Sequence, residues 1–423
     1  MTEFLDAMLL FGLVVFLLVI RQPLVVILLA VAAYVHLVWG RARLDFIVED
    51  MWVSLDKELI LAIPMFLLCG GVMTKGSTAR RLIRIASSLT GHLPGGLGVA
   101  AILSCGVFGA ISGSSVVTML AIGTVIYPAM KEAGYSNRFA LGTVMSGGTL
   151  GIIIPPSIPL IIYGIVTETS IIDLFLAGIG PGILLVILFS LYSVWANRKI
   201  RVKRFELCEV TAAFREGAWA LMMPVLLLGG IYSGYFTATE SASVALLYAV
   251  CVEAFIHREL KFADLHGVYV EAIKLVGALF PLIAVALSLN LVLTENRVPV
   301  AMVALIQEWF TSPLAFIITV NLLLLAVGAV MTTNEAILIL APLLMPAALA
   351  FGFDPVLFGI IMILNLEIGY LTPPVGLNLM VAMTAFRQKF GELVIAALPF
   401  IGLMLVALVL VSWFPWISLR LVR

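Results

Sequence analysis

Few side chains in this 423-residue chain carry charge or a reactive group. Lysine, arginine, aspartate and glutamate together make up 11% of the residues, and the formal net charge is zero. The four cysteines and four histidines are scattered, which fits neither a disulfide framework nor a metal-ligand cluster. There is no Walker A motif and no Ser/His/Asp, HExxH or paired-carboxylate arrangement. These absences argue against ATP hydrolysis and against an enzyme, and the lack of a basic stripe argues against nucleic-acid binding.

Hydrophobic residues dominate instead, at 63% of the chain. Apolar runs that approach or reach the roughly 20 residues needed to span a bilayer occur at 8–20, 24–38, 171–194, 217–235 and 394–411. Glu3 and Asp6 precede the first run, where a signal peptide would carry basic residues, so we expect a retained helix. The composition predicts an all-α, multi-pass protein embedded in a lipid bilayer.

One hydrophobic element occurs twice, at a constant offset of 218 positions. Each copy contains a double proline, which removes two backbone donors and clashes with the preceding turn, so each helix must unwind there. Interrupted segments at matching places in two halves are typical of a transporter's binding site. The residues that recur are Pro128, Ala129, Gly134, Gly151, Pro155 and Pro156, which return as Pro346, Ala347, Gly352, Gly369, Pro373 and Pro374.

A short polar break precedes each double proline. It reads SGSS at 112–115 in the first copy and TTNE at 332–335 in the second. The first run, about 35 residues with a polar middle, is too interrupted for two full spans. We therefore expect re-entrant helical hairpins at 96–131 and 313–350, Pro-Pro-broken helices at 137–166 and 356–386, and one final span.

The cationic residues outside these runs predict the topology. They cluster at 75–84, 131–138, 198–215, 258–261 and 387–389, and the positive-inside tendency puts these clusters in the cytoplasm. Both termini then lie on the opposite side, and the two hairpins open to opposite faces, as in an inverted-topology repeat. We divide the chain into scaffold helices at 1–57, a first repeat at 58–197, a cytoplasmic loop at 198–217 and a second repeat at 218–423.

The two polar breaks predict two Na⁺ sites. Na⁺ favours uncharged oxygens, and the C-termini of half-helices add partial negative charge. The alternatives are small residues that ease helix packing at the tips, and plain proline kinks at the breaks. The first predicted site comprises Ser112, Gly113, Ser114, Ser115, Gly151, Pro155 and Pro156, and the second comprises Thr332, Thr333, Asn334, Gly369, Thr372 and Pro373.

A small organic anion is expected between the two tips. Half-helix N-termini that face one point favour a carboxylate or sulfonate, and two cations beside one anion offset its charge. Ser114, Arg297 and Glu335 are the predicted substrate contacts. Arg297 fits an interfacial, snorkelling arginine equally well. Glu335 and Glu367 are costly inside a membrane unless they are paired or functional.

Six stretches carry a family resemblance: 63–66, 91–97, 108–115, 154–159, 365–369 and 372–378. With them the chain resembles the large membrane subunit of tripartite ATP-independent periplasmic (TRAP) transporters, from about residue 60 to the C-terminus. The resemblance implies an elevator-type, Na⁺-driven importer with a small four-helix membrane subunit and a periplasmic substrate-binding protein as partners. We therefore expect a bacterial inner-membrane protein without an organic cofactor, and the cation distribution predicts that both termini are periplasmic.

Two rival interpretations remain open at this stage. One is a stand-alone Na⁺-coupled dicarboxylate symporter with the same hairpin architecture. The other is a channel or a non-transporting membrane scaffold. A channel needs a continuous polar pore, whereas the polar residues of this chain cluster at two tips and two breaks.

Overall fold

A computed structural model describes residues 2–38, 44–200, 202, 204–310 and 312–423. Parts of the predicted scaffold and cytoplasmic loop, including Arg201 and Lys203, lie outside the described residues. Within the described ranges the chain forms helices and no strand, which confirms the all-α prediction. Eight helical stretches there are long and apolar enough to cross a membrane.

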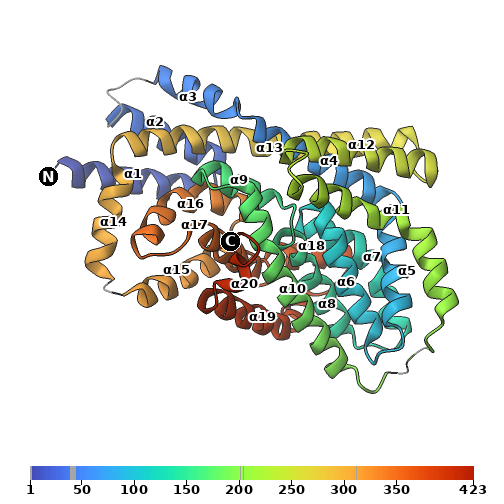
Figure 1. The fold of residues 1–423 in the computed structure, drawn as a ribbon. Coiled ribbons are helices and arrows are strands. Elements are labelled where there is room, and N and C mark those ends of the chain that lie inside the picture. The colour runs from blue at the N-terminus through green and yellow to red at the C-terminus, as the bar shows by residue number, and fades with distance from the viewer. Residues whose placement is uncertain (1, 39–43, 201, 203, 311) are drawn as a thin grey trace.

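One group of helices forms a wall along one side of the molecule (Figure 1). Its longest member, α13, has 34 residues and packs against α2, α3 and α4, while α4 packs against α12 and α11 packs against both α12 and α5. We call this group the scaffold. It comprises α1 (Thr2–Val19), α2 (Leu24–Val38), α3 (Asp45–Leu55), η1 (Glu58–Leu61), α4 (Ala62–Lys75), α11 (Leu207–Tyr232), α12 (Ala238–Cys251), η2 (Val252–Ile256) and α13 (Phe262–Glu295).

The remaining helices contain the two repeated elements. The first set is α5 (Thr78–Thr90), α6 (Gly96–Ser112), α7 (Ser115–Glu132), α8 (Asn137–Ile153), α9 (Ile158–Thr167) and α10 (Ile171–Ala196). The second set is α14 (Val298–Trp309), α15 (Pro313–Gly328), α16 (Thr333–Ala350), α17 (Pro355–Gly369), α18 (Leu377–Ala385), α19 (Phe390–Trp413) and α20 (Trp416–Leu419). Each double proline lies between two helices, α8 and α9 or α17 and α18, because proline cannot donate the hydrogen bond that would continue the helix.

Capping side chains determine where the half-helices begin. The hydroxyls of Ser114 and Ser157 each accept a hydrogen bond from the backbone amide three residues on, at 3.5 Å, and start α7 and α9. α16 starts with a capping box, in which the Glu335 amide donates to the Thr332 hydroxyl and the Thr332 amide donates to the Glu335 carboxylate. Such bonds satisfy amide groups that a helix N-terminus leaves without partners. Some tip side chains are therefore structural caps as well as candidate ligands.

The half-helix that follows each break packs against the other repeat. α9, which follows the first break, packs against α16 of the second repeat, and α18, which follows the second break, packs against α7 of the first. The Tyr163 hydroxyl of α9 donates to the carbonyl oxygen of Pro355 at 2.9 Å, which ties α9 to α17. Each half-helix thus buries its apolar surface against the other repeat, and the two repeats form one structural unit.

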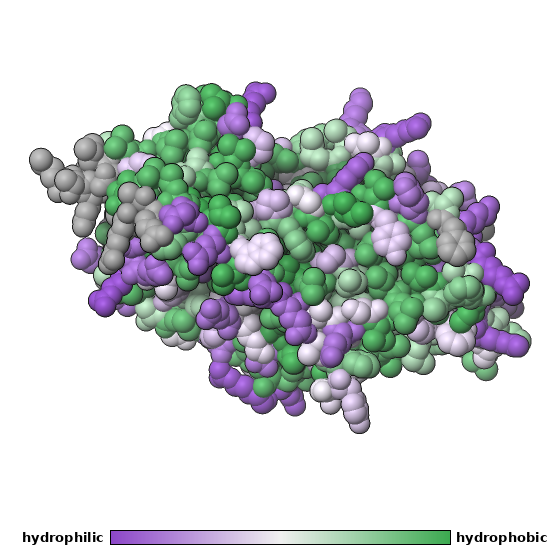
Figure 2. Space-filling view, turned by 90° about the horizontal axis from the view of Figure 1, so that it is seen from above, coloured by the Kyte–Doolittle hydropathy of each residue, from purple (hydrophilic) through white to green (hydrophobic). Residues whose placement is uncertain are grey.

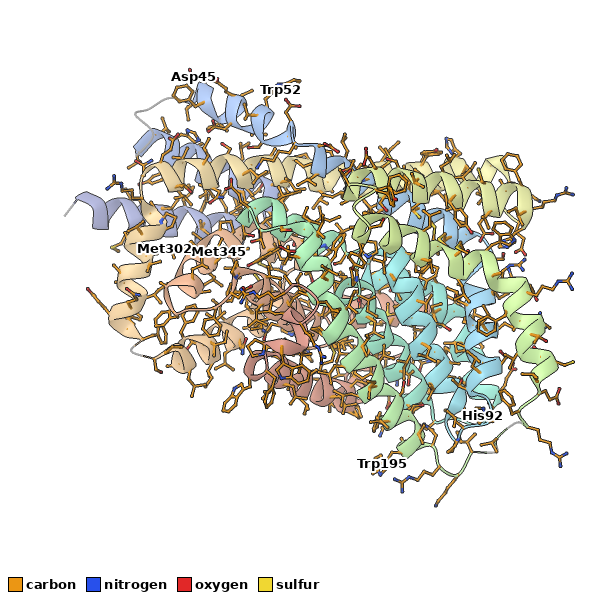
Figure 3. The ribbon with its side chains drawn as sticks, viewed as in Figure 1. Asp45, Trp52, His92, Trp195, Met302 and Met345 are labelled. Carbon is orange, nitrogen blue, oxygen red and sulfur yellow. The ribbon has the colours of Figure 1, made fainter. Side chains whose placement is uncertain are left out.

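Three helices were not expected from the hydropathy pattern: α3, α5 and α14. In α5, apolar residues such as Leu82 and Ile85 are buried, while Arg84 points to the surface and pairs with Glu209 and Glu216. This amphipathic helix connects α4 of the scaffold to α6. In Figure 3, Met302 of α14 and Met345 of α16 lie close together, consistent with the packing of these two helices.

Large apolar side chains cover much of the outer surface. Hydrophobic residues spread over the face seen in Figure 2, interrupted by hydrophilic residues along its margins and in a band across its middle. Trp52 of α3, labelled in Figure 3, is 77% exposed, and Ile273 of α13 and Leu322 of α15 are 67% and 63% exposed. A soluble monomer rarely exposes so much contiguous apolar surface. This surface fits contact with lipid or with another membrane subunit.

Candidate functional site

The first polar break forms the turn between α6 and α7. Gly113 has a φ of 59°, a backbone conformation that glycine adopts without strain. The Ser112 hydroxyl lies 2.6 Å from the Thr118 hydroxyl on α7, and both side chains are buried. We call residues 112–115 tip 1. The Ser112 and Ser114 hydroxyls are held by contacts inside this pair of helices.

Tip 1 touches the first Pro-Pro break. A Cβ on Gly151 would lie 2.7 Å from the carbonyl oxygen of Ser114, which is closer than real Cβ atoms come. The carbonyl oxygen of Pro156 comes within 3.2 Å of the position that a Cβ on Gly113 would take. The missing side chain of Gly151 therefore lets the broken helix approach the tip. The predicted proximity of tip 1 to this break is confirmed.

The second polar break, which we call tip 2 (332–335), adjoins the second Pro-Pro break in a similar way. The amides of Val375 and Gly376 both donate to the carbonyl oxygen of Ala329, just before the tip, at 3.1 Å. A Cβ on Gly369 would lie 2.7 Å from the amide nitrogen of Ala329. Gly151 and Gly369, which are equivalent in the two repeats, thus each let a broken helix come close to the neighbouring turn. The turn that leads into tip 2 therefore contacts the segment around the second break, while a contact of tip 2 itself with Pro373-Pro374 stays a prediction.

A buried polar cluster lies between the two tips. The Thr333 hydroxyl donates to Oε1 of Glu367 at 3.0 Å, and the Thr333 amide donates to the Tyr370 hydroxyl at 2.8 Å. The Ser115 hydroxyl accepts a hydrogen bond from the Asn378 side-chain amide at 2.7 Å, and the Asn378 backbone amide donates to the carbonyl oxygen of Tyr370 at 3.2 Å. Ser115, Thr333, Glu367 and Asn378 are each at most 1% exposed. Tyr370 and Asn378 of the second repeat therefore connect the two tips.

Both tips also line one cavity of about 710 Å³. Tip 1 contributes Ser114 and Ser115, and tip 2 contributes Thr332, Asn334 and Glu335. The facing wall comes from the scaffold and includes residues 277–279 and 281–282 of α13 together with the start of α2. The cavity therefore lies between the repeated elements and the scaffold.

Four helix N-termini reach this cavity. They belong to α7, α9, α16 and α18, whose first turns place Ser115, Ile158, Asn334 and Leu377 in its lining. A helix N-terminus carries partial positive charge and unpaired amide donors, so four of them favour an anion. Among the described residues that line the cavity, Glu335 is the one with a formal charge. The attraction for an anion would thus come from backbone dipoles.

The remaining predicted site residues are more dispersed. Arg297 is exposed, forms the turn between α13 and α14, and does not line the cavity. Pro155 and Pro156 are buried, whereas Pro373 and Pro374 are exposed. The first break is covered partly by α10, where Gly178 lies against the Pro155 ring. The two breaks, equivalent in sequence, therefore differ in their access to solvent.

No functional role was predicted for Thr118, Tyr370 or Asn378. All three are polar residues in or next to apolar helices, and this is the signal that could have drawn attention to them. The partners of Tyr370 and Asn378 lie in other helices: Asn378 bonds to a serine 263 positions away. A sequence shows the polar residue but not the partner that satisfies it.

Comparison with known proteins agrees with these features. The model of the family described as "Tripartite ATP-independent periplasmic transporter, DctM component" matches residues 11–417. The chain is 42% identical over 369 residues to the C4-dicarboxylate TRAP transporter large permease protein DctM of Pseudomonas aeruginosa, and 86% of each chain is covered. It is 38% identical over 414 residues to the isethionate TRAP transporter permease protein DctMQ of Oleidesulfovibrio alaskensis, covering 97% of this chain and 65% of that protein.

The fold is similar to a solved transporter structure. The YdaH transporter of Alcanivorax borkumensis matches with a TM-score of 0.61 at 15% sequence identity, and 88% of each chain is covered. At this identity the similarity concerns the fold alone. The family match over nearly the whole chain and the relatives above 30% identity are decisive for classification. The chain belongs to the DctM family, the large permease component of tripartite ATP-independent periplasmic transporters.

Proposed function

We propose that this permease imports a small organic anion, a carboxylate or sulfonate, together with Na⁺. The observation that carries the proposal is the convergence of four helix N-termini on one cavity that both tips line. Relatives are named for C4-dicarboxylate and for isethionate, and both are small organic anions. Positive helix ends in a largely apolar cavity suit the negative group that such molecules share.

Na⁺ is proposed as the co-transported ion. Tip 1 offers Ser112, Ser114 and Ser115, with backbone carbonyls near Gly151 and the Pro155-Pro156 break. Tip 2 offers Thr332, Thr333 and Asn334, with carbonyls near Gly369, Thr372 and Pro373. These are uncharged oxygens next to helix C-termini, the donor set that suits a hard monovalent cation. Among the described residues, no group of three His, Cys, Asp or Glu side chains is placed to hold a metal ion, so the ligands of a divalent transition metal are missing there.

The anion is proposed to lie in the cavity against Ser114 of tip 1 and beside Glu335 of tip 2. Both residues line the cavity. A carboxylate at Glu335 repels a second negative charge, so bound Na⁺ has to offset it if the substrate is a dianion. Arg297 lies outside this cavity, and a contact with it would require the substrate to occupy another position during transport.

An elevator-type movement is proposed to provide alternating access. The cavity separates the repeated elements from α13 and α2, so it marks the surface along which the two parts could slide. The inverted repeat supplies one hairpin for each side of the membrane. The different exposure of the two Pro-Pro breaks supports this, because the halves of an alternating-access repeat adopt unequal conformations in any one state.

The partners follow from the family. A small four-helix membrane subunit is proposed to cover part of the exposed apolar surface, and a periplasmic substrate-binding protein is proposed to deliver the anion. The chain is proposed to lie in a bacterial inner membrane with both termini in the periplasm.

Uptake by proteoliposomes tests this function. The permease is reconstituted with its small subunit, and a labelled C4-dicarboxylate or isethionate is supplied with its cognate binding protein. Uptake is expected with a Na⁺ gradient and not with K⁺ alone. Uptake in K⁺ buffer would contradict Na⁺ coupling, and uptake without the binding protein would instead support a stand-alone symporter.

A further inference from the structure

We infer that Asn378 is a positioning residue that makes Na⁺ binding at the two tips cooperative. From the second repeat its side chain holds the Ser115 hydroxyl of tip 1, and its backbone amide bonds to Tyr370, whose hydroxyl accepts from the Thr333 amide of tip 2. The inference rests on the proposed Na⁺ coupling and adds to it a specific connection between the two ion sites.

Asn378 lies in the first turn of α18, directly after the second Pro-Pro break. Its Nδ2 donates to the Ser115 hydroxyl at 2.7 Å and to the carbonyl oxygen of Met145 on α8 at 3.3 Å. Both partners belong to the first repeat, whereas α18 belongs to the second. This one amide group therefore fixes the position of a tip 1 hydroxyl relative to the other repeat.

The orientation of the Asn378 amide is determined by its surroundings. The Met145 carbonyl can only accept a hydrogen bond, so the nitrogen must face it, and the flipped amide would place two acceptors together. Both amide hydrogens are then used, and Oδ1 of Asn378 has no donor among the described residues. The side chain is fully buried, so water does not compete for these bonds.

The connection continues from tip 1 to tip 2. The backbone amide of Asn378 donates to the carbonyl oxygen of Tyr370 at 3.2 Å, and the Tyr370 hydroxyl accepts from the Thr333 amide at 2.8 Å. A Na⁺ ion that shifts Ser115 at tip 1 therefore shifts Asn378 and Tyr370, and with them Thr333 at tip 2.

Such a chain supplies the physical requirement for cooperativity. Two sites are coupled when both bias one shared structural element, and the coupling is reciprocal. Here the shared element is the buried series of hydrogen bonds from Ser115 through Asn378 and Tyr370 to Thr333, with the Asn378 side chain as its anchor. Without the Asn378 side chain, binding of one Na⁺ ion no longer raises the affinity of the other site for Na⁺.

The test compares Asn378→Ala with a matched control, Asn365→Ala. Asn365 is also a fully buried amide and donates to Asn321 and to the carbonyl oxygen of Ile361, both at 2.8 Å, but all three residues lie in the second repeat. Uptake by the reconstituted complex is measured against Na⁺ concentration. Thermal unfolding of each purified variant is measured against Na⁺ concentration as an independent binding readout.

The wild-type protein is expected to show a Hill coefficient for Na⁺ well above 1. In Asn378→Ala it should fall to about 1, and half-saturating Na⁺ should rise roughly fivefold or more, the lower end of typical coupling between sites. Asn365→Ala should lose stability but keep the Hill coefficient. If Asn378→Ala does not fold, Asn378→Asp, which has the same shape but no amide donor, carries the same expectation.

Three results would overturn the inference. These are a wild-type Hill coefficient of 1, an unchanged coefficient in both Asn378 variants, and an equal decrease in the Asn365 control. Uptake by the wild type that needs no Na⁺ would instead refute the proposed function, so the two failures can be told apart.

Discussion

Replacing Glu253 by glutamine is expected to destabilise the junction between the scaffold and α5. Glu253 lies at the end of α12, in the π-helical turn η2, and is 1% exposed. Its carboxylate accepts hydrogen bonds from the backbone amides of Ser77 at 3.0 Å and Thr78 at 3.1 Å, and both hydroxyls of these residues bond to it as well. One buried carboxylate thus satisfies the first amides of α5, the helix that leads to the first hairpin.

The expected magnitude follows from the donors that would lose their partner. Glutamine at position 253 keeps one oxygen and places an NH₂ group where the other carboxylate oxygen stood. The backbone amide of Ser77 or Thr78 then faces this NH₂ group, which is itself a donor. That amide loses a hydrogen bond to a charged group, worth roughly 1.5–3 kcal/mol. Loss of negative charge at a helix N-terminus adds about 0.3–1 kcal/mol. The free energy of unfolding should therefore fall by about 2–4 kcal/mol.

Chemical unfolding of the purified protein in detergent measures this change. Glu259→Gln is the control, because Glu259 lies nearby but is 36% exposed and pairs with Arg80 and Arg81 at 3.4 and 3.5 Å. Exposed ion pairs contribute about 0–1 kcal/mol, so the control should lose less than about 1 kcal/mol. Equal losses in the two variants would refute the capping role assigned to Glu253.

Two further substitutions probe the site directly. Gly151→Ala places a Cβ against the Ser114 carbonyl and should lower stability by about 1–3 kcal/mol, whereas Gly391→Ala, with open space around it, should leave thermal unfolding unchanged. Thr332→Leu removes the cap of α16 and an oxygen of tip 2, so half-saturating Na⁺ for uptake should rise, while Thr384→Leu on the exposed side of α18 should not change it. A Gly151 variant as stable as its control, or unchanged Na⁺ dependence in Thr332→Leu, would contradict the geometry described here.

The positions of the breaks could be predicted because they depend on local chemistry. A double proline removes two successive backbone donors and ends a helix, whereas single prolines such as Pro128 and Pro281 lie inside α7 and α13. α9, capped by Ser157, accordingly begins at Ile158 and α18 at Leu377, each shortly after a double proline. The polar tips also stand out from the apolar runs that contain them, so the residues of the candidate site could be chosen from the sequence.

The short helices were missed for an equally physical reason. Hydropathy reveals runs long enough to span a bilayer, whereas α5 has 13 residues and an apolar stripe on one face only. Its role becomes visible only when Glu253, from a distant helix, is seen to cap it. Likewise, the sequence predicted Arg297 as a substrate contact, but its side chain is exposed at a turn and does not line the cavity.

The sequence by itself determined the fold class, the repeat and the residues at each break. Only the tertiary structure decided which elements meet: α9 with α16, α18 with α7, and Asn378 with Ser115 across 263 positions. In a membrane protein the lipid-facing and inward-facing surfaces are both apolar, so hydropathy does not distinguish them. A buried polar group must find a partner, but the packing of the whole chain determines which partner comes within reach.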